Sequence, residues 1–85
     1  MIEKTAYIGY IRDLVFLLRE TGACAHLEKE KTASAFHEGR EMAFREVLAW
    51  MQHQADAFQL PKEELGLYGL DPFVDSLDPP CSKPP

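Results

Sequence analysis

The sequence predicts an all-α fold: an antiparallel two-helix hairpin plus short C-terminal helical turns, pairing with a second copy into a dimeric four-helix bundle. Apolar residues recur at helical spacing over two stretches of similar length, about residues 3–31 and 34–60. Each stretch presents an apolar arc of about half the helix circumference, which is wider than one neighbouring helix covers. At 85 residues a single core gives only marginal stability, which favours self-association.

The first helix is expected over about residues 3–31. Its apolar positions are Tyr7, Ile8, Tyr10, Ile11, Leu14, Val15, Leu17, Leu18 and Ala25, and Arg12, Asp13, Arg19, Glu20 and Glu30 are expected on the opposite, solvent side. Gly22 is the weakest point, because glycine inside a helix costs about 1 kcal/mol relative to alanine. An end at Thr21-Gly22 is the alternative, but it leaves very unequal arms, so a turn at residues 31–34 is preferred.

The second helix is expected over about residues 34–60. Its apolar side consists of Phe36, Ala43, Phe44, Val47, Trp50, Met51, Ala55 and Phe58, and its polar side of Glu38, Glu41, Arg45, Gln52 and Asp56. Thr32 or Ser34 is the expected N-cap, since a side-chain hydroxyl accepts a hydrogen bond from a free amide of the first turn. Pro61 ends the helix because proline lacks an amide donor and restricts Leu60 before it.

Short helical turns are expected over residues 61–77. Pro61 and Gly66 have the form of the first position and the end of one turn, and Asp71-Pro72 has the form of an N-cap and first position of another. The segment is too apolar for a free tail, so it is expected to fold back onto the hairpin or a second subunit. Residues 1–77 are thus predicted to form one domain, and residues 78–85 a flexible proline-rich tail.

Self-association is expected to cover the apolar surface that the hairpin leaves open, and a homodimer has the commonest symmetry. The residues expected at the core and the dimer interface are Tyr7, Ile11, Leu14, Leu18, Ala43, Val47, Trp50, Met51 and Phe58. Trp50, Phe44, Met51 and Phe58 are interpreted as core rather than as a cofactor site.

Two polar residues, Arg40 and Gln54, interrupt the apolar stripe of the second helix. In the favoured interpretation Gln54 bonds a tyrosine hydroxyl or its symmetry mate, and Arg40 pairs with Glu20 or Glu28, so that both fix the register. The alternative interpretation makes both residues ligand contacts in a groove.

Composition argues against nucleic-acid and membrane-spanning functions. The net charge is −5, with 14 acidic against 9 basic side chains, and no basic stripe is present to neutralise phosphates. The longest apolar run, from Leu14 to Leu18, is far short of the roughly 20 residues that span a bilayer. The N-terminus lacks the charged and apolar regions of a secretory signal, so reduced thiols at Cys24 and Cys81 and a cytoplasmic location are expected.

No catalytic, cofactor-binding or metal-binding residue is predicted. Glu38 and Glu41 form Glu-x-x-Glu, a spacing that all-α nucleotide pyrophosphohydrolases use for Mg²⁺, but no second carboxylate pair exists and both side chains are expected on the outer face. Glu41 and Arg45 instead form an i,i+4 ion pair on an exposed surface. No histidine lies three residues after a glutamate, as di-iron bundles require. The sequence therefore predicts a protein that is not an enzyme.

Residues 39–48, together with Met51, Gln54, Ala55, Phe58 and the segment 60–67, resemble a group of small uncharacterised bacterial proteins, some of the kind carried on mobile elements such as integron gene cassettes. The resemblance covers about residues 34–70. It implies a helical, oligomeric accessory protein of the bacterial cytoplasm, with no activity or ligand attached. Gly39 and Ala43, spaced four apart, are interpreted as a close approach between helices.

The leading hypothesis is a small dimeric helical module that binds another protein or regulates one, through an outer face or the C-terminal segment. The surplus apolar surface and the absence of a catalytic constellation favour it. The alternative is a helical bundle that binds, or binds and hydrolyses, a small molecule or nucleotide at a polar site made of Arg40, Gln54, His37 and the tyrosines.

Overall fold

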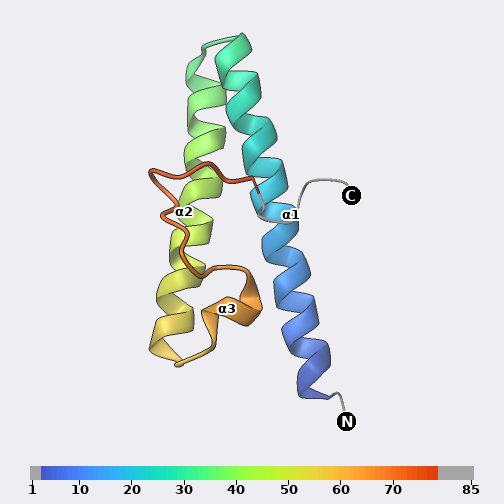
Figure 1. The fold of residues 1–85 in the computed structure, drawn as a ribbon. Coiled ribbons are helices and arrows are strands. Elements are labelled where there is room, and N and C mark those ends of the chain that lie inside the picture. The colour runs from blue at the N-terminus through green and yellow to red at the C-terminus, as the bar shows by residue number, and fades with distance from the viewer. Residues whose placement is uncertain (1–2, 79–85) are drawn as a thin grey trace.

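The computed structural model describes residues 3–78 and contains the helices α1 (Lys4–Lys31), α2 (Ala35–Ala57) and α3 (Lys62–Leu65). Helices α1 and α2 run antiparallel, lie close together near their connecting turn and separate toward the other end, where α3 lies between them (Figure 1). The predicted all-helical hairpin is therefore confirmed. In the described part of the chain, no helix is long and apolar enough to cross a membrane.

The turn between the long helices lies where the sequence places it. Helix α1 continues through Gly22 to Lys31, and its C-terminal turn carries Lys29 and Lys31, which suit the negative end of the helix dipole. Ser34 is the N-cap of α2, and its hydroxyl accepts a hydrogen bond from the amide of His37 at 3.2 Å. These local signals resolve the choice between a turn at Gly22 and a turn near residue 32.

Helix α2 ends at Ala57, three residues before the predicted end at Leu60. The amide of Leu60 donates to the carbonyl of Ala55 at 2.8 Å, and the amide of Gln59 donates to the carbonyl of Asp56 at 3.1 Å. This pair of bonds is a Schellman motif, which requires a left-handed residue after the C-cap. Gln59 fills that position with φ 57°, so the helix stops through its own C-terminal turn before Pro61 is reached.

Replacing Gln59 with glycine is expected to raise the free energy of unfolding by about 0.5 kcal/mol. Glycine removes the steric cost of the left-handed backbone, roughly 1–2 kcal/mol for an L-residue, and part of that gain is lost to the greater freedom of glycine in the unfolded chain. Chemical denaturation followed by circular dichroism measures the change. Glycine in place of Glu46, at an exposed position within α2, is the control and should destabilise.

The core forms where α1, α2 and the segment after α2 meet. Its buried residues are Val15, Leu48, Ala55, Leu65, Leu67, Leu70 and Leu77, with Ile8, Ile11, Leu18, Phe44 and Met51 packed against them. Leu48, which is 0% exposed, is absent from the predicted apolar face. Helix α2 is rotated by about one residue from its predicted orientation, so positions 41, 44, 48, 51 and 55 face α1, and positions 43, 47, 50, 54 and 58 do not.

Residues 60–78, named here the C-terminal strap, fold back across the hairpin (Figure 1). Apolar side chains of the strap are buried against α1 and α2, namely Leu65, Leu67, Leu70, Pro72 and Leu77. Asp71 caps a turn by accepting the amide of Phe73 on its side chain at 3.1 Å, as predicted, although regular helix does not follow it. Asp78 is held in place by Arg19 rather than belonging to a free tail, and residues 79–85 of the predicted tail lie outside the described residues.

The close approach between elements occurs at Gly22 and not at Gly39. A Cβ atom at Gly22 would lie 2.6 Å from Cδ1 of Leu77 and 3.1 Å from Cβ of Phe44. A Cβ atom at Gly39 would meet nothing within 4 Å, and Ala43 is exposed. The glycine that weakens α1 in the sequence is therefore the one that lets the strap and α2 pack against it.

Candidate functional site

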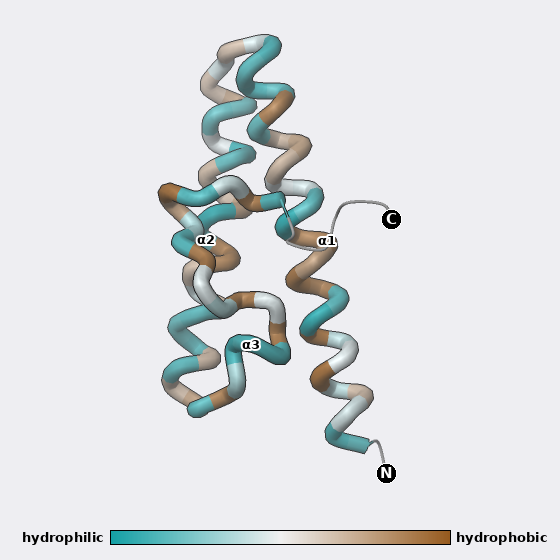
Figure 2. Tube along the Cα trace, viewed as in Figure 1, coloured by the Kyte–Doolittle hydropathy of each residue, from teal (hydrophilic) through white to brown (hydrophobic). Residues whose placement is uncertain are grey.

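An apolar groove of about 360 Å³ lies at the open end of the hairpin. Its lining comes from α1, from the last three turns of α2 and from the strap: Ile11, Val47, Trp50, Met51, Gln54, Ala55, Phe58, Leu60, Leu65 and Leu67. Gln54 is the one amide or charged side chain among them. Hydrophobic residues are concentrated in the N-terminal half of α1 and along the strap, as the brown segments in Figure 2 show.

The rim of this groove carries large apolar side chains that no other residue of the segment 3–78 covers. Trp50 is 65% exposed and Phe58 is 72% exposed, while Val47 and Leu60 are each 43% exposed. On α1, Tyr7 and Leu14 lie one helical turn to either side of Ile11, and they are 57% and 36% exposed. We call the surface formed by these six residues and the groove the groove face.

The residues predicted for the core and dimer interface divide into two sets in the structure. Ile11, Leu18 and Met51 pack against the core. The others are exposed in the single chain: Tyr7, Leu14, Ala43, Val47, Trp50 and Phe58. The interpretation of Trp50 and Phe58 as core residues is therefore wrong for the monomer, because the strap and the rotation of α2 fill the core with Leu48, Leu65 and Leu67 instead.

Arg40 and Gln54 lie at opposite ends of the α2 stripe, about 21 Å apart along the helix. Arg40 pairs with Glu28 at 2.8 Å, which confirms one of the two predicted partners, and its guanidinium lies 5.7 Å from the centre of the Phe44 ring. Gln54 lines the groove beside Ile11. Arg40 and Gln54 therefore do not converge on one polar site, as the ligand-binding alternative requires.

Arg19 is the main residue that sequence reasoning placed wrongly. It was expected on the solvent face of α1, but it is 6% exposed and binds main-chain carbonyls of the strap. Its guanidinium donates to Leu77 at 3.1 Å, to Gly66 at 3.0 Å and to Asp78 at 2.9 Å. Burial lowers the pKa of Arg19 below its ordinary value, and the carboxylates of Asp78 and Asp75 oppose that shift.

Glu41 is buried, although it was expected on an exposed surface. Its carboxylate is 2.8 Å from Lys29, 2.9 Å from His26 and 2.8 Å from Arg45, so the predicted pair with Arg45 is confirmed within a larger cluster. Burial alone would raise the pKa of Glu41, but hydrogen bonds from Lys29, Arg45 and His26 lower it to about 2. The cluster joins α1 to α2 near the turn.

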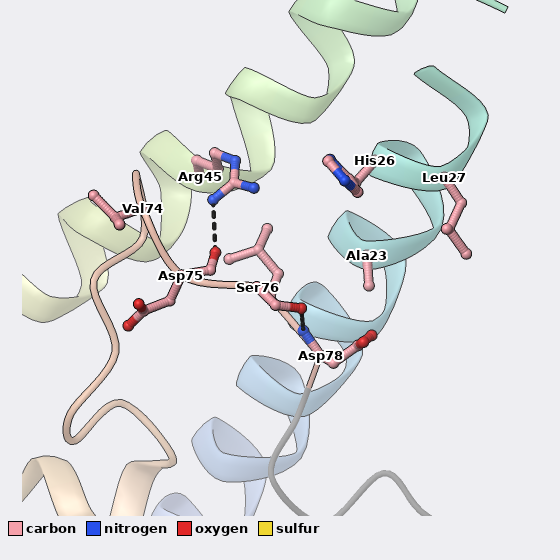
Figure 3. Close-up of a pocket in the computed structure, with 9 residues that line it drawn as sticks. Ala23, His26, Leu27, Arg45, Val74, Asp75, Ser76 and Asp78 are labelled. Atoms are coloured by element: carbon pink, nitrogen blue, oxygen red, sulfur yellow. Dashed lines mark hydrogen bonds between the residues drawn. The ribbon is translucent and has the colours of Figure 1, made fainter. Parts of the chain in front are cut away.

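A cavity of about 260 Å³, lined by both polar and apolar side chains, lies beside this cluster. Figure 3 shows His26 and Arg45 reaching toward it from α1 and α2, opposite the strap residues Asp75 and Asp78. Arg45 donates to the carboxylate of Glu41. It also donates to the carbonyl of Pro72 at 2.7 Å and to that of Asp75 at 2.9 Å. Arg45 thus holds the strap and the buried carboxylate in place.

The two carboxylates of the Glu-x-x-Glu pair lie in different environments. Glu38 is exposed while Glu41 is buried, so the Glu-x-x-Glu pair does not present two carboxylates on one open surface. Within residues 3–78, no group of three or more His, Cys, Asp or Glu side chains is placed to hold a metal ion.

Comparison of the chain with protein-family models, with curated proteins and with solved structures finds no match in any of the three.

Proposed function

We propose that the protein is a homodimeric helical module whose two chains associate through the groove face, so that two hairpins form a four-helix bundle. The observation that carries the proposal is the second apolar stripe of α2, where Val47, Trp50 and Phe58 border an apolar groove and remain exposed. The strap covers the other side of the hairpin and leaves this stripe open.

The size of the groove face supports a dimer. Its three aromatic residues each expose on the order of 140 Å² and its three aliphatic residues about half of that, which gives roughly 600 Å² per protomer and about 1,200 Å² for a pair. Specific protein interfaces begin at about that total area. Contiguous apolar patches of this size on a small monomer mark interaction sites.

Self-complementarity favours a second copy over an unrelated partner. Trp50 projects beside the groove that it helps to line, so a two-fold axis through this face places the indole of each chain against the groove of the other. A two-fold interface uses the same patch on both chains. The stripe residues Ala43, Val47, Trp50, Gln54 and Phe58 are all uncharged, so the charged side chains of α2 are kept away from the contact.

A dimer of this kind serves as a compact interaction or regulatory unit. It presents two copies of the outer, acidic surfaces, on which a further protein partner binds. In this proposal the module works in the reducing cytoplasm, where the exposed thiol of Cys24 stays free.

Replacing Trp50 with glutamate is expected to raise the dimer dissociation constant by about thirtyfold or more. The substitution removes an aromatic anchor of the kind that dominates interfaces and puts a charge against an apolar surface that cannot pair it. Light scattering coupled to size exclusion, run over a hundredfold range of protein concentration, measures the change in mass from the 9.7 kDa of one chain.

Phe36→Glu is the matched control, because Phe36 is 72% exposed and lies about 21 Å along α2 from Trp50. It should dimerise as the wild type does. A wild-type protein that stays monomeric at every concentration, or a Trp50→Glu variant that dimerises normally, contradicts the proposal. A monomer whose groove binds an added amphipathic peptide would instead make a different protein the occupant.

A further inference from the structure

We propose that strap docking and dimerisation are coupled, and that Arg19 is the residue that positions the strap's part of the dimer surface. The inference rests on the proposed function and adds to it how the dimerisation is controlled. It follows from how the strap is attached to the hairpin and from which strap residues reach the groove.

Three side chains of the hairpin hold the strap through its main-chain carbonyls. Arg19 binds both ends of the strap, at Gly66 and at Leu77 and Asp78. Gln52 donates to the carbonyls of Leu67 at 3.0 Å and Leu70 at 2.6 Å. Arg45 binds the middle of the strap, as described above, so seven hydrogen bonds from α1 and α2 fix its course.

The segment Leu65-Gly66-Leu67 connects these anchors to the groove. Its carbonyls at Gly66 and Leu67 accept from Arg19 and Gln52, while the side chains of Leu65 and Leu67 form one wall of the groove. The wall is therefore in place only while the strap is docked. Arg19 does not itself line the groove, so it acts on the dimer surface through the strap.

The chemistry of the anchoring side chains makes the docking of the strap dependent on association with a second chain. The guanidinium of Arg19 is buried, and desolvation of a buried cation offsets much of the energy of its hydrogen bonds. The hydrogen bonds of Arg19 therefore fix the position of the strap more than they raise the free energy of unfolding. A second chain that covers Leu60 and enters the groove walled by Leu65 and Leu67 binds the docked strap and not the released one, so association must stabilise docking by linkage.

Hydrogen exchange of the wild-type protein tests the coupling without any substitution. The amide of Leu67 donates to Lys62, and the amides of Val74 and Asp75 donate to Asp71, so all three report on the docked strap. Their protection is expected to rise about tenfold or more between the monomeric and dimeric concentration ranges. Equal protection in the two ranges overturns the inference and leaves the dimer itself untouched.

Arg19→Gln gives the second arm of the test, with Arg12→Gln at an exposed position of α1 as its control. Arg19→Gln is expected to keep the helicity of α1 and α2, to lose strap protection, and to raise the dimer dissociation constant at least about tenfold. Arg12→Gln should match the wild type in all three measurements. A folded Arg19→Gln protein with a wild-type dissociation constant overturns the coupling, whereas a wild type that never dimerises overturns the proposed function.

Discussion

Replacing Leu48 with alanine is expected to lower the free energy of unfolding by about 3 kcal/mol. Leu48 is 0% exposed and belongs to the one buried cluster that joins α1, α2 and the strap. Truncation removes buried apolar surface and leaves a cavity among side chains that three elements hold in place. A domain of this length has only about 4–13 kcal/mol of stability in total, so this one change removes a large share of it.

Urea denaturation at one fixed protein concentration measures this loss, since a dimer's stability depends on concentration. Leu27→Ala is the control, because Leu27 is also on a long helix but is 59% exposed, and its truncation should change the stability by less than about 0.5 kcal/mol. A loss below 1 kcal/mol for Leu48→Ala would show that the core does not centre on this residue.

The sequence predicts the elements of this fold well because their signals are local. Ser34 accepts the amide three residues later, and Asp71 caps the turn that follows it. Each signal needs only the chain next to it. The end of α2 is the exception, since Gln59 takes a left-handed conformation that is usual for glycine.

The orientation of α2 could not be predicted, because two apolar stripes overlap on it. The stripe through Val47 and Trp50 is as apolar as the stripe through Leu48 and Ala55. Which one faces α1 depends on the strap, whose leucines come from far along the chain and pack against Leu48. Periodicity identifies an amphipathic helix, but it does not choose between adjacent faces.

Buried charged side chains are the second feature that could not be predicted from the sequence. The sequence predicts Arg19 on the solvent face because its acceptors are main-chain carbonyls 47 to 59 positions away. Every residue has such a carbonyl, so the residue type does not reveal which one accepts the bond. Glu41 is similar, since two of its three partners, His26 and Lys29, are on α1. In both cases one charged side chain is buried because a distant segment satisfies it.

Glu41→Gln is expected to cost about 3 kcal/mol at neutral pH and to flatten the acid side of the stability profile. Hydrogen bonds from Lys29, Arg45 and His26 hold the pKa of Glu41 at about 2 in the folded protein, against an ordinary value of 4.5. A lowered folded-state pKa means that the ionised carboxylate stabilises the fold above pH 4.5. That stabilisation is lost as the pH falls from about 5 toward 2, because the unfolded chain binds the proton first.

The difference in unfolding free energy between the wild type and Glu41→Gln, measured by urea denaturation from pH 7 to pH 2, isolates this contribution. It should be largest above pH 5 and shrink toward pH 2, where the wild-type carboxylate is protonated as well. Glu46→Gln, at an exposed position of α2, removes the same charge without a buried cluster and should give a small, flat difference. If the two difference curves coincide, the Glu41 cluster does not stabilise the hairpin, and the link between α1 and α2 near the turn rests on apolar packing alone.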